Sequence, residues 1–362
     1  MFKRPLGLHV VQRGELSAPA AWGFRLLAVL AALAAGGLFL LSLGYNPFSV
    51  YASMIGGSLG TAGMQRETIK LAIPLALTSL GVLLAFKMRF WNIGAEGQFA
   101  MGAIAASYFA YFQAHLPSPL LLVLMALAAV LAAGLWGLVP AWFKTRFGTN
   151  ETLFTLMLNY IVFYLITFLR EGPWREGSGG FAATPRFPRQ ARLPEVPLPF
   201  VGNIHIGWIV LIVMAVLVFV YLKWTKHGYE ITVVGENERT ARYAGMPVKK
   251  IVLRTMFLSA AVCGLAGMLQ VAGPDRQLTD AVAGGRGFQA VSVVWLARLS
   301  PFGSVFVSFL FAIMQKGSSM MQTEYRIPAS MSDILQGIVL FCVLGAEFFL
   351  RFSLRRQKEA LT

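Results

Sequence analysis

A carboxylate and two side-chain amides stand close together at the start of an apolar stretch. Asn92, Glu96 and Gln98 belong to the segment 90–99, which reads FWNIGAEGQF and leads into an apolar run that ends near Phe112. Ionisable and amide groups inside a bilayer are costly unless they face other protein or a water-filled path. We therefore predict that these three residues lie beside a translocation path. The alternative is a polar helix start at the membrane surface, capped by Asn92.

A second polar stripe lies further along the chain. Glu151, Thr155 and Asn159 are spaced by four residues, so they would line one face of a helix. Asn159 falls near the middle of an apolar segment that ends near Leu169. Such a stripe either lines a pathway or joins neighbouring helices through hydrogen bonds, and both interpretations stay open. We add these three residues to the predicted translocation path.

One internal segment, residues 225–250, is strongly charged and lies between two apolar runs. Its residues 236–243 are compatible with a helix, and Gly245 and Pro247 are typical of a helix end. A short surface helix between two membrane segments either docks a soluble partner or is an ordinary solvated connection.

The composition is that of an integral membrane protein. Of the 362 residues, 57% are hydrophobic and 13% are charged, whereas a soluble globular domain carries roughly 25% charged residues. The apolar runs are too long for β-barrel strands, so we expect an all-α membrane protein. The net charge of +15 comes mainly from basic residues at the ends of these runs. Basic residues at such positions orient a membrane protein, so the charge does not indicate nucleic-acid binding.

The chemistry of an enzyme or a metal site has no counterpart in the sequence. There is no G-x-x-x-x-G-K-[ST] motif, so we do not expect ATP to bind through a P-loop. There is no Ser-His-Asp or Cys-His constellation, and Glu96 has no sequence neighbour suited to act as a catalytic base. Cys263 and Cys342 lie in apolar segments and indicate packing residues rather than a disulfide. The four histidines show no ligand spacing, so we expect neither a metal nor a cofactor.

The apolar runs predict about ten transmembrane segments with both termini on the cytoplasmic side. Residues 1–21 would form a basic lead, residues 22–350 the membrane domain and residues 351–362 a cytoplasmic tail. The proline-rich segment 170–205 is expected to be an extended extracytoplasmic loop, although it contains five arginines. The run 288–299 is too short to cross the hydrocarbon core upright.

Three motifs resemble those of the membrane permeases of ABC importers. They are residues 92–98 (NIGAEGQ), residues 150–151 with 157–160 (NE and MLNY), and residues 235–237 with 241–245 (GEN and ARYAG). The motifs occur in the family's order, and the similarity runs from the second predicted segment to the tenth. The sequence is most similar to the nucleoside-type branch of the class that serves branched-chain amino acids and simple sugars. Its long proline-rich loop looks like that of the larger of two paired permeases.

The resemblance implies a type II-like permease in the cell membrane that takes up a nucleoside or a related small polar solute. It implies cytoplasmic ATPase subunits that hydrolyse ATP, a second and shorter permease subunit, and an extracytoplasmic substrate-binding lipoprotein. The same resemblance implies an ATPase-coupling role for Gly235, Glu236, Asn237, Ala241, Arg242, Tyr243, Ala244 and Gly245.

Other solutes and another transport class remain as alternatives. A simple sugar, riboflavin or a branched-chain amino acid would suit the same class of permease. An ion-coupled secondary transporter would need paired intramembrane ionisable groups and repeat symmetry. The sequence offers Glu96 as a single candidate group and no obvious inverted repeat.

Overall fold

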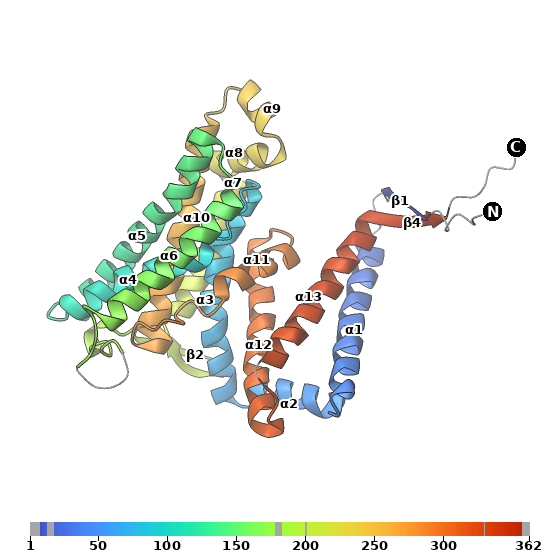
Figure 1. Cartoon of the computed structure of the whole chain (residues 1–362), viewed down its shortest axis with the longest axis horizontal. Coiled ribbons are helices and arrows are strands. Elements are labelled where there is room, and N and C mark those ends of the chain that lie inside the picture. Colours follow the sequence, from blue (N-terminus) through green and yellow to red (C-terminus); the bar gives the residue numbers. More distant parts are fainter. Residues whose placement is uncertain (1–7, 13–17, 178–182, 200, 329, 357–362) are drawn as a thin grey trace, which may run out of the picture. The chain divides into compact units, whose positions relative to one another are not determined.

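The structure is a computed structural model that describes residues 8–12, 18–177, 183–199, 201–328 and 330–356, and most of these residues are helical (Figure 1). This confirms the expected all-α class. The helices are α1 (Ala18–Ser42), α2 (Pro47–Leu59), α3 (Ala62–Lys87), α4 (Ala95–Phe112), α5 (Ser118–Phe147), α6 (Glu151–Glu171), α7 (Gly207–Trp224), α8 (Lys226–Glu236), α9 (Glu238–Tyr243), α10 (Val248–Gln270), α11 (Arg286–Leu296), α12 (Pro301–Tyr325) and α13 (Ser330–Arg351). The chain divides into two compact units, Ser58–Lys316 and the two chain ends Met1–Gly57 with Gly317–Thr362.

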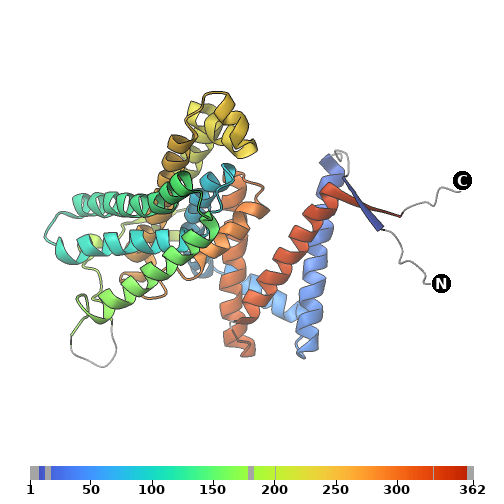
Figure 2. The ribbon, with the colours of Figure 1, turned by 45° about the horizontal axis from the view of Figure 1, so that its top comes forward.

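The larger unit is built around α3 and α10. Within their most apolar stretches, 83% of the α3 residues and 72% of the α10 residues are buried, against 22–33% in α5, α6, α7 and α12. Helix α10 packs against α3, α4 and α5 (Figures 1 and 2). A Cβ atom at Gly102 of α4 would lie 2.3 Å from the backbone of Gly264 in α10. Glycine at such a crossing allows the two backbones to touch, as is common where membrane helices associate.

Six helices in the described residues are long and apolar enough to cross a membrane: α3, α5, α6, α7, α10 and α12. A seventh crossing results if residues Leu27–Ser42 and α2, which meet at an angle of 114°, count as one span. The sequence predicted about ten segments. Helix α4 is not among the six because its first turn carries polar residues, and α11 has only 11 residues. The short run at 288–299 is thus confirmed as too short to span.

The long proline-rich segment contains more structure than the sequence predicted. It includes a 3-10 turn at Arg189–Ala191 and an antiparallel hairpin of β2 (Glu195–Leu198) and β3 (Gly202–His205). The hairpin pairs Glu195 with His205. Residues 178–182 and 200 of this segment lie outside the described residues. In the rest of it, backbone hydrogen bonds tie the segment to Ala272 and Arg276 after α10.

The smaller unit pairs helices and strands from the two chain ends. Strand β1 (Leu8–Gln12) runs antiparallel to β4 (Phe352–Arg356), and α1 packs against α13. Its apolar core contains Leu40, Val50, Met54, Met321, Ile327 and Leu335. Helix α1 begins at Ala18, within the predicted lead. Residues 1–7 and 13–17 of that lead and residues 357–362 of the predicted tail lie outside the described residues.

Candidate functional site

The loop that precedes α4 is held in place by a pair of buried side-chain amides. Asn92 Nδ2 donates to Gln98 Oε1 at 3.0 Å, and Gln98 Nε2 donates back to Asn92 Oδ1 at 3.1 Å. Asn92 Nδ2 also lies 3.4 Å from the Ser259 hydroxyl of α10, which donates to the Gly81 carbonyl of α3 at 2.7 Å. The reciprocal pair satisfies two polar side chains that would otherwise be costly to bury, and it joins the loop to two central helices.

Helix α6 holds the same loop from another side. The Thr155 hydroxyl accepts a hydrogen bond from the Ile93 N–H at 3.2 Å. Asn159 Oδ1 accepts from the Gly97 N–H at 2.9 Å, and its Nδ2 donates to the Ile93 carbonyl at 3.1 Å. Thr155 and Asn159 are both buried. Two of the three residues in the predicted polar stripe of α6 therefore bind the backbone of the 92–98 motif.

Glu96 closes the N-terminus of α11. Its Oε1 accepts from the Gly285 N–H at 2.7 Å and its Oε2 accepts from the Gly287 N–H at 2.5 Å. A Cβ atom at Gly287 would lie 2.2 Å from the Glu96 nitrogen, so only glycine allows this approach. An anion at a helix N-terminus is favoured by the partial positive charge of the unpaired N–H groups. These bonds explain how a carboxylate can be buried with 3% exposure.

The structure brings together five of the six predicted path residues, namely Asn92, Glu96, Gln98, Thr155 and Asn159. Glu151 lies apart from them and forms an ion pair with Lys144 Nζ at 2.7 Å. The alternative that Asn92 caps α4 is wrong. Helix α4 begins at Ala95 after Gly94, and no side chain among the described residues caps it; Asn92 Oδ1 accepts from the Gly94 N–H instead, in a local turn.

The predicted surface helix in the charged segment is confirmed, with different bounds. Two helices are present, α8 and α9, separated by Asn237. Asn237 Oδ1 accepts from the N–H groups of Arg239 and Thr240, so the second helix begins at Glu238 rather than at residue 236. Its last residue, Tyr243, is 92% exposed. An almost fully exposed aromatic side chain on a short polar helix is available to a partner.

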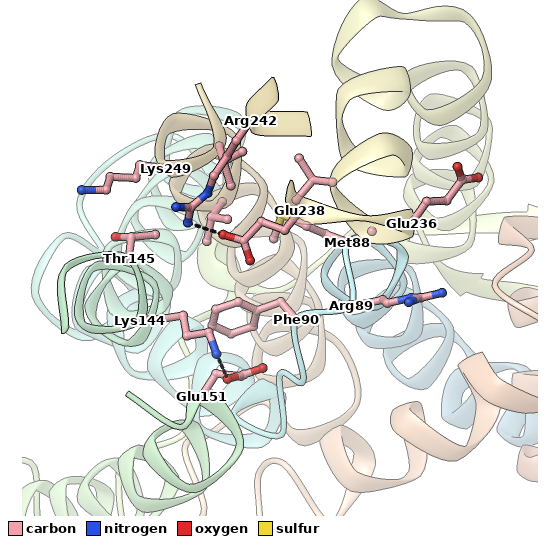
Figure 3. A pocket seen from close by; sticks show the side chains of 14 residues that line it. Met88, Arg89, Phe90, Lys144, Thr145, Glu151, Glu236, Glu238, Arg242 and Lys249 are labelled. Carbon is pink, nitrogen blue, oxygen red and sulfur yellow. Dashed lines mark hydrogen bonds and ion pairs between the residues drawn. The ribbon is translucent and has the colours of Figure 1, made fainter. Parts of the chain in front are cut away.

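A pocket of about 290 Å³ connects this charged segment with the loop before α4 (Figure 3). Its walls come from α8, α9, residues 88–90, the end of α5 and the start of α6 and α10. Two ion pairs border it, Glu238 with Arg242 and Lys144 with Glu151 (Figure 3). Phe90, two residues before Asn92, lines the same pocket. The predicted coupling residues Gly235, Glu236 and Arg242 therefore share one cavity with Glu151, the predicted path residue that lies apart from the other five.

Helix α8 also touches the end of α3 directly. A Cβ atom at Gly235 would lie 2.2 Å from the Lys87 carbonyl oxygen, so the two backbones are in contact. Elsewhere on α8, Glu230 accepts a hydrogen bond from Arg254 of α10 at 2.9 Å. This hydrogen bond lowers the pKa of the Glu230 carboxyl below its usual range. This pair could not be predicted from local spacing, because its members are 24 residues apart.

Comparison with known proteins places these features in a family. The family described as branched-chain amino acid transport system / permease component matches residues 64–344. The glucose ABC transporter permease protein TsgB13 of Haloferax volcanii is 34% identical to this chain, over 95% of this chain and 93% of the relative. The guanosine ABC transporter permease protein NupP of Bacillus subtilis is 30% identical over 92% and 96%. The nucleoside ABC transporter permease protein NupB of Lactococcus lactis is 27% identical over 92% and 93%.

The family match covers the 92–98 motif, the polar stripe of α6, the surface helix α9 and the break between α10 and α11. The apolar helices of the larger unit are those of a multi-pass membrane protein. The chain belongs to the branched-chain amino acid transport system permease family and is a membrane permease subunit of an ABC importer.

Proposed function

We propose that this permease forms the translocation path for a nucleoside or a related small polar solute. Two of the relatives carry guanosine and nucleoside in their names, and each aligns with more than nine-tenths of this chain. A simple sugar is the second candidate, because the relative with 34% identity is named a glucose permease. Hydrogen-bonding side chains along the path would suit either solute, since both carry several hydroxyl groups.

The movement that drives transport begins at α9 in this proposal. Cytoplasmic ATPase subunits bind the exposed face of α9, around Arg242 and Tyr243, and close when they bind ATP. The observation that carries the proposal is the backbone contact of Gly235 with the end of α3, beside a pocket that also contains Phe90. A displacement of α8 and α9 would reach the loop before Asn92 through these contacts, and a path with two alternative arrangements could then switch its access.

The remaining partners follow from the same role. A second and shorter permease completes the pore in the cell membrane, and an extracytoplasmic lipoprotein delivers the solute. In this arrangement Glu96, Asn92, Gln98, Thr155 and Asn159 hold the helices that surround the path. Their hydrogen bonds are made within the protein, so a solute that passes beside them would meet a preformed wall.

A mild-detergent pull-down of this chain from its native membrane, followed by mass spectrometry, tests the proposed assembly. We expect a P-loop ATPase and a second permease in the eluate. The co-encoded binding protein would then be titrated with guanosine and with glucose to identify the solute. Recovery of this chain alone, still active in uptake driven by an ion gradient, would contradict the proposal.

A further inference from the structure

The break between α10 and α11 collects buried polar groups that have no partner. In the described part of the chain, four side chains that are at most 8% exposed carry a nitrogen or oxygen atom without a hydrogen bond: His205, Thr255, Gln270 and Arg286. Gln270 and Arg286 are the two ends of residues 270–286, where α10 ends in a π-helical turn (Val271–Asp275) and the chain returns to α11, and His205 packs against that turn. Buried unpaired polar atoms are rare in native proteins and call for a ligand or water.

His205 presents a hydrogen-bond donor at this break. Its Nδ1 accepts from the Gly207 N–H at 3.2 Å, so the proton of the neutral ring is on Nε2, which has no acceptor. Burial and the positive charge of Lys70 hold the pKa of His205 at about 4, so the ring is neutral at pH 7. The ring packs on the π-helical turn, because a Cβ atom at Gly273 would lie 3.3 Å from it.

Gln270 and Arg286 supply an acceptor and a second donor. Gln270 Nε2 donates to Asp275 Oδ1 at 2.8 Å, which leaves Gln270 Oε1 unpaired. Arg286 Nη1 donates to the carbonyls of Val282 and Ala283, both at 3.2 Å, which leaves Nε unpaired. The Arg286 charge also acts on the carboxyls of Asp275 and Glu96. Buried polar side chains therefore extend from His205 in the β2–β3 hairpin, through Gln270 and Arg286, towards Glu96 of the 92–98 motif.

We propose that residues 270–286, together with His205, form an entry subsite for a neutral, polyhydroxylated solute. His205 Nε2–H and Arg286 Nε–H donate to solute hydroxyl oxygens, and Gln270 Oε1 accepts from a solute hydroxyl. A hydroxyl group both donates and accepts, so vicinal hydroxyls of a ribose or hexose match this mixed set. The inference rests on the proposed function, because it assigns a place to the solute of that transporter.

Charge decides against an anionic solute at this subsite. Arg286 is flanked by two carboxylates, and the N-terminus of α11, which would otherwise attract an anion, is filled by Glu96. A phosphorylated sugar or nucleotide would therefore meet the carboxylates of Asp275 and Glu96 beside Arg286.

The position of the subsite fits entry rather than exit. Helix α10 has 23 residues and a length of about 35 Å, and the subsite lies at its end while α8 and α9 contact its start. The solute would thus meet this subsite on the side away from the proposed ATPase. The segment before α7 covers it, through hydrogen bonds from the Leu193 N–H to the Ala272 carbonyl and from the Phe187 N–H to the Arg276 carbonyl.

Uptake kinetics of the complete importer in proteoliposomes test the subsite, with labelled guanosine and glucose as probes. Gln270→Met removes the acceptor, and with it the donor to Asp275, with little change in volume. Thr255→Val is the control because it removes an unpaired buried hydroxyl elsewhere in α10. We expect Gln270→Met to raise the KM for the imported probe by about tenfold. Thr255→Val should leave the KM unchanged.

A second variant tests whether a raised KM comes from misfolding rather than from a lost solute contact. Arg286→Lys keeps the charge near Asp275 and Glu96 but removes the Nε–H, so it should also raise the KM. Its thermal unfolding midpoint, measured beside that of the wild type, shows whether the variant folds. A KM within twofold of wild type in both variants, with uptake intact, would overturn the subsite and leave the proposed function standing. Failure of the wild-type importer to take up either probe would overturn the proposed solute class, and the subsite with it.

Discussion

Replacing Glu96 with glutamine tests whether its carboxylate stabilises the fold or acts on the solute. In the structure both carboxylate oxygens accept backbone N–H groups, at 2.7 Å from Gly285 and 2.5 Å from Gly287. Glutamine keeps the shape but offers one oxygen, so its NH2 group would face one of the two N–H donors. The variant loses one charge-assisted hydrogen bond, worth about 1.5–3 kcal/mol, and leaves a buried N–H unpaired at a similar cost. It also loses the favourable charge at the α11 N-terminus, about 0.3–1 kcal/mol.

We therefore expect Glu96→Gln to lower the free energy of unfolding by about 3–5 kcal/mol, after allowing for overlap between these contributions. Titration of the purified permease with a denaturing detergent, followed by tryptophan fluorescence, measures the change. Glu151→Gln is the matched control. It also neutralises a glutamate next to an intramembrane segment, but it breaks a partly exposed ion pair with Lys144 worth at most about 1 kcal/mol.

Glu96→Asp refines the test, because the shorter carboxylate keeps its charge but cannot reach both amides. Its loss should fall between those of the control and Glu96→Gln. The reasoning is refuted if Glu96→Gln unfolds within about 0.5 kcal/mol of the wild type. Abolished uptake by such a stable variant would indicate that the carboxylate acts on the solute or on the transport cycle rather than on the packing of α11.

Three further predictions concern the coupling segment and the hairpin. Gly235→Ala should clash with the end of α3 and uncouple ATP hydrolysis from uptake, whereas Gly63→Ala, which places its Cβ in open space with only one atom within 4 Å, should change neither rate. Changing Arg242 and Tyr243 to alanine should detach the ATPase in co-purification without lowering the unfolding midpoint, since both side chains are exposed. Because His205 has a pKa of about 4 in the folded chain and an ordinary value of 6.5, the unfolded chain binds more protons between these pH values. Stability should therefore fall by up to about 3 kcal/mol from pH 7 to pH 4, and His205→Asn should flatten that part of the pH profile of unfolding.

The sequence was informative where chemistry and spacing are local. The four-residue spacing of Thr155 and Asn159 placed both on one face of α6, and the charged segment contained the expected short helix. It was less informative about bounds, because Asn237 looked like an interior residue of the helix that it caps. Hydropathy also counted α4, whose first turn is polar, as a full span.

The partners of the polar residues could not be predicted from the sequence. Glu96 finds its two amides 189 and 191 residues away, at the N-terminus of α11. Burial of a carboxylate is favourable only where donors are already in place, and their position depends on how α4 and α11 pack. Gln270 and Arg286 gave no signal for the same reason: a lone glutamine at the end of an apolar run and an arginine in a loop are individually ordinary.

The contrast between the two polar regions bears on how the permease would move. Around Asn92 and Gln98 the buried side-chain amides and hydroxyls are paired, and such a network holds its helices in one arrangement. Around the π-helical turn, by comparison, three buried groups lack partners, and an unpaired buried group costs about 1–3 kcal/mol. A solute that supplied the missing partners would stabilise the arrangement in which they face it. The paired motif would then move as a rigid body when α8 and α9 are displaced, while the break between α10 and α11 is the part whose preferred arrangement changes with solute. A higher solute concentration should therefore restore uptake by variants at Gln270, and it should not restore uptake by variants at Asn92.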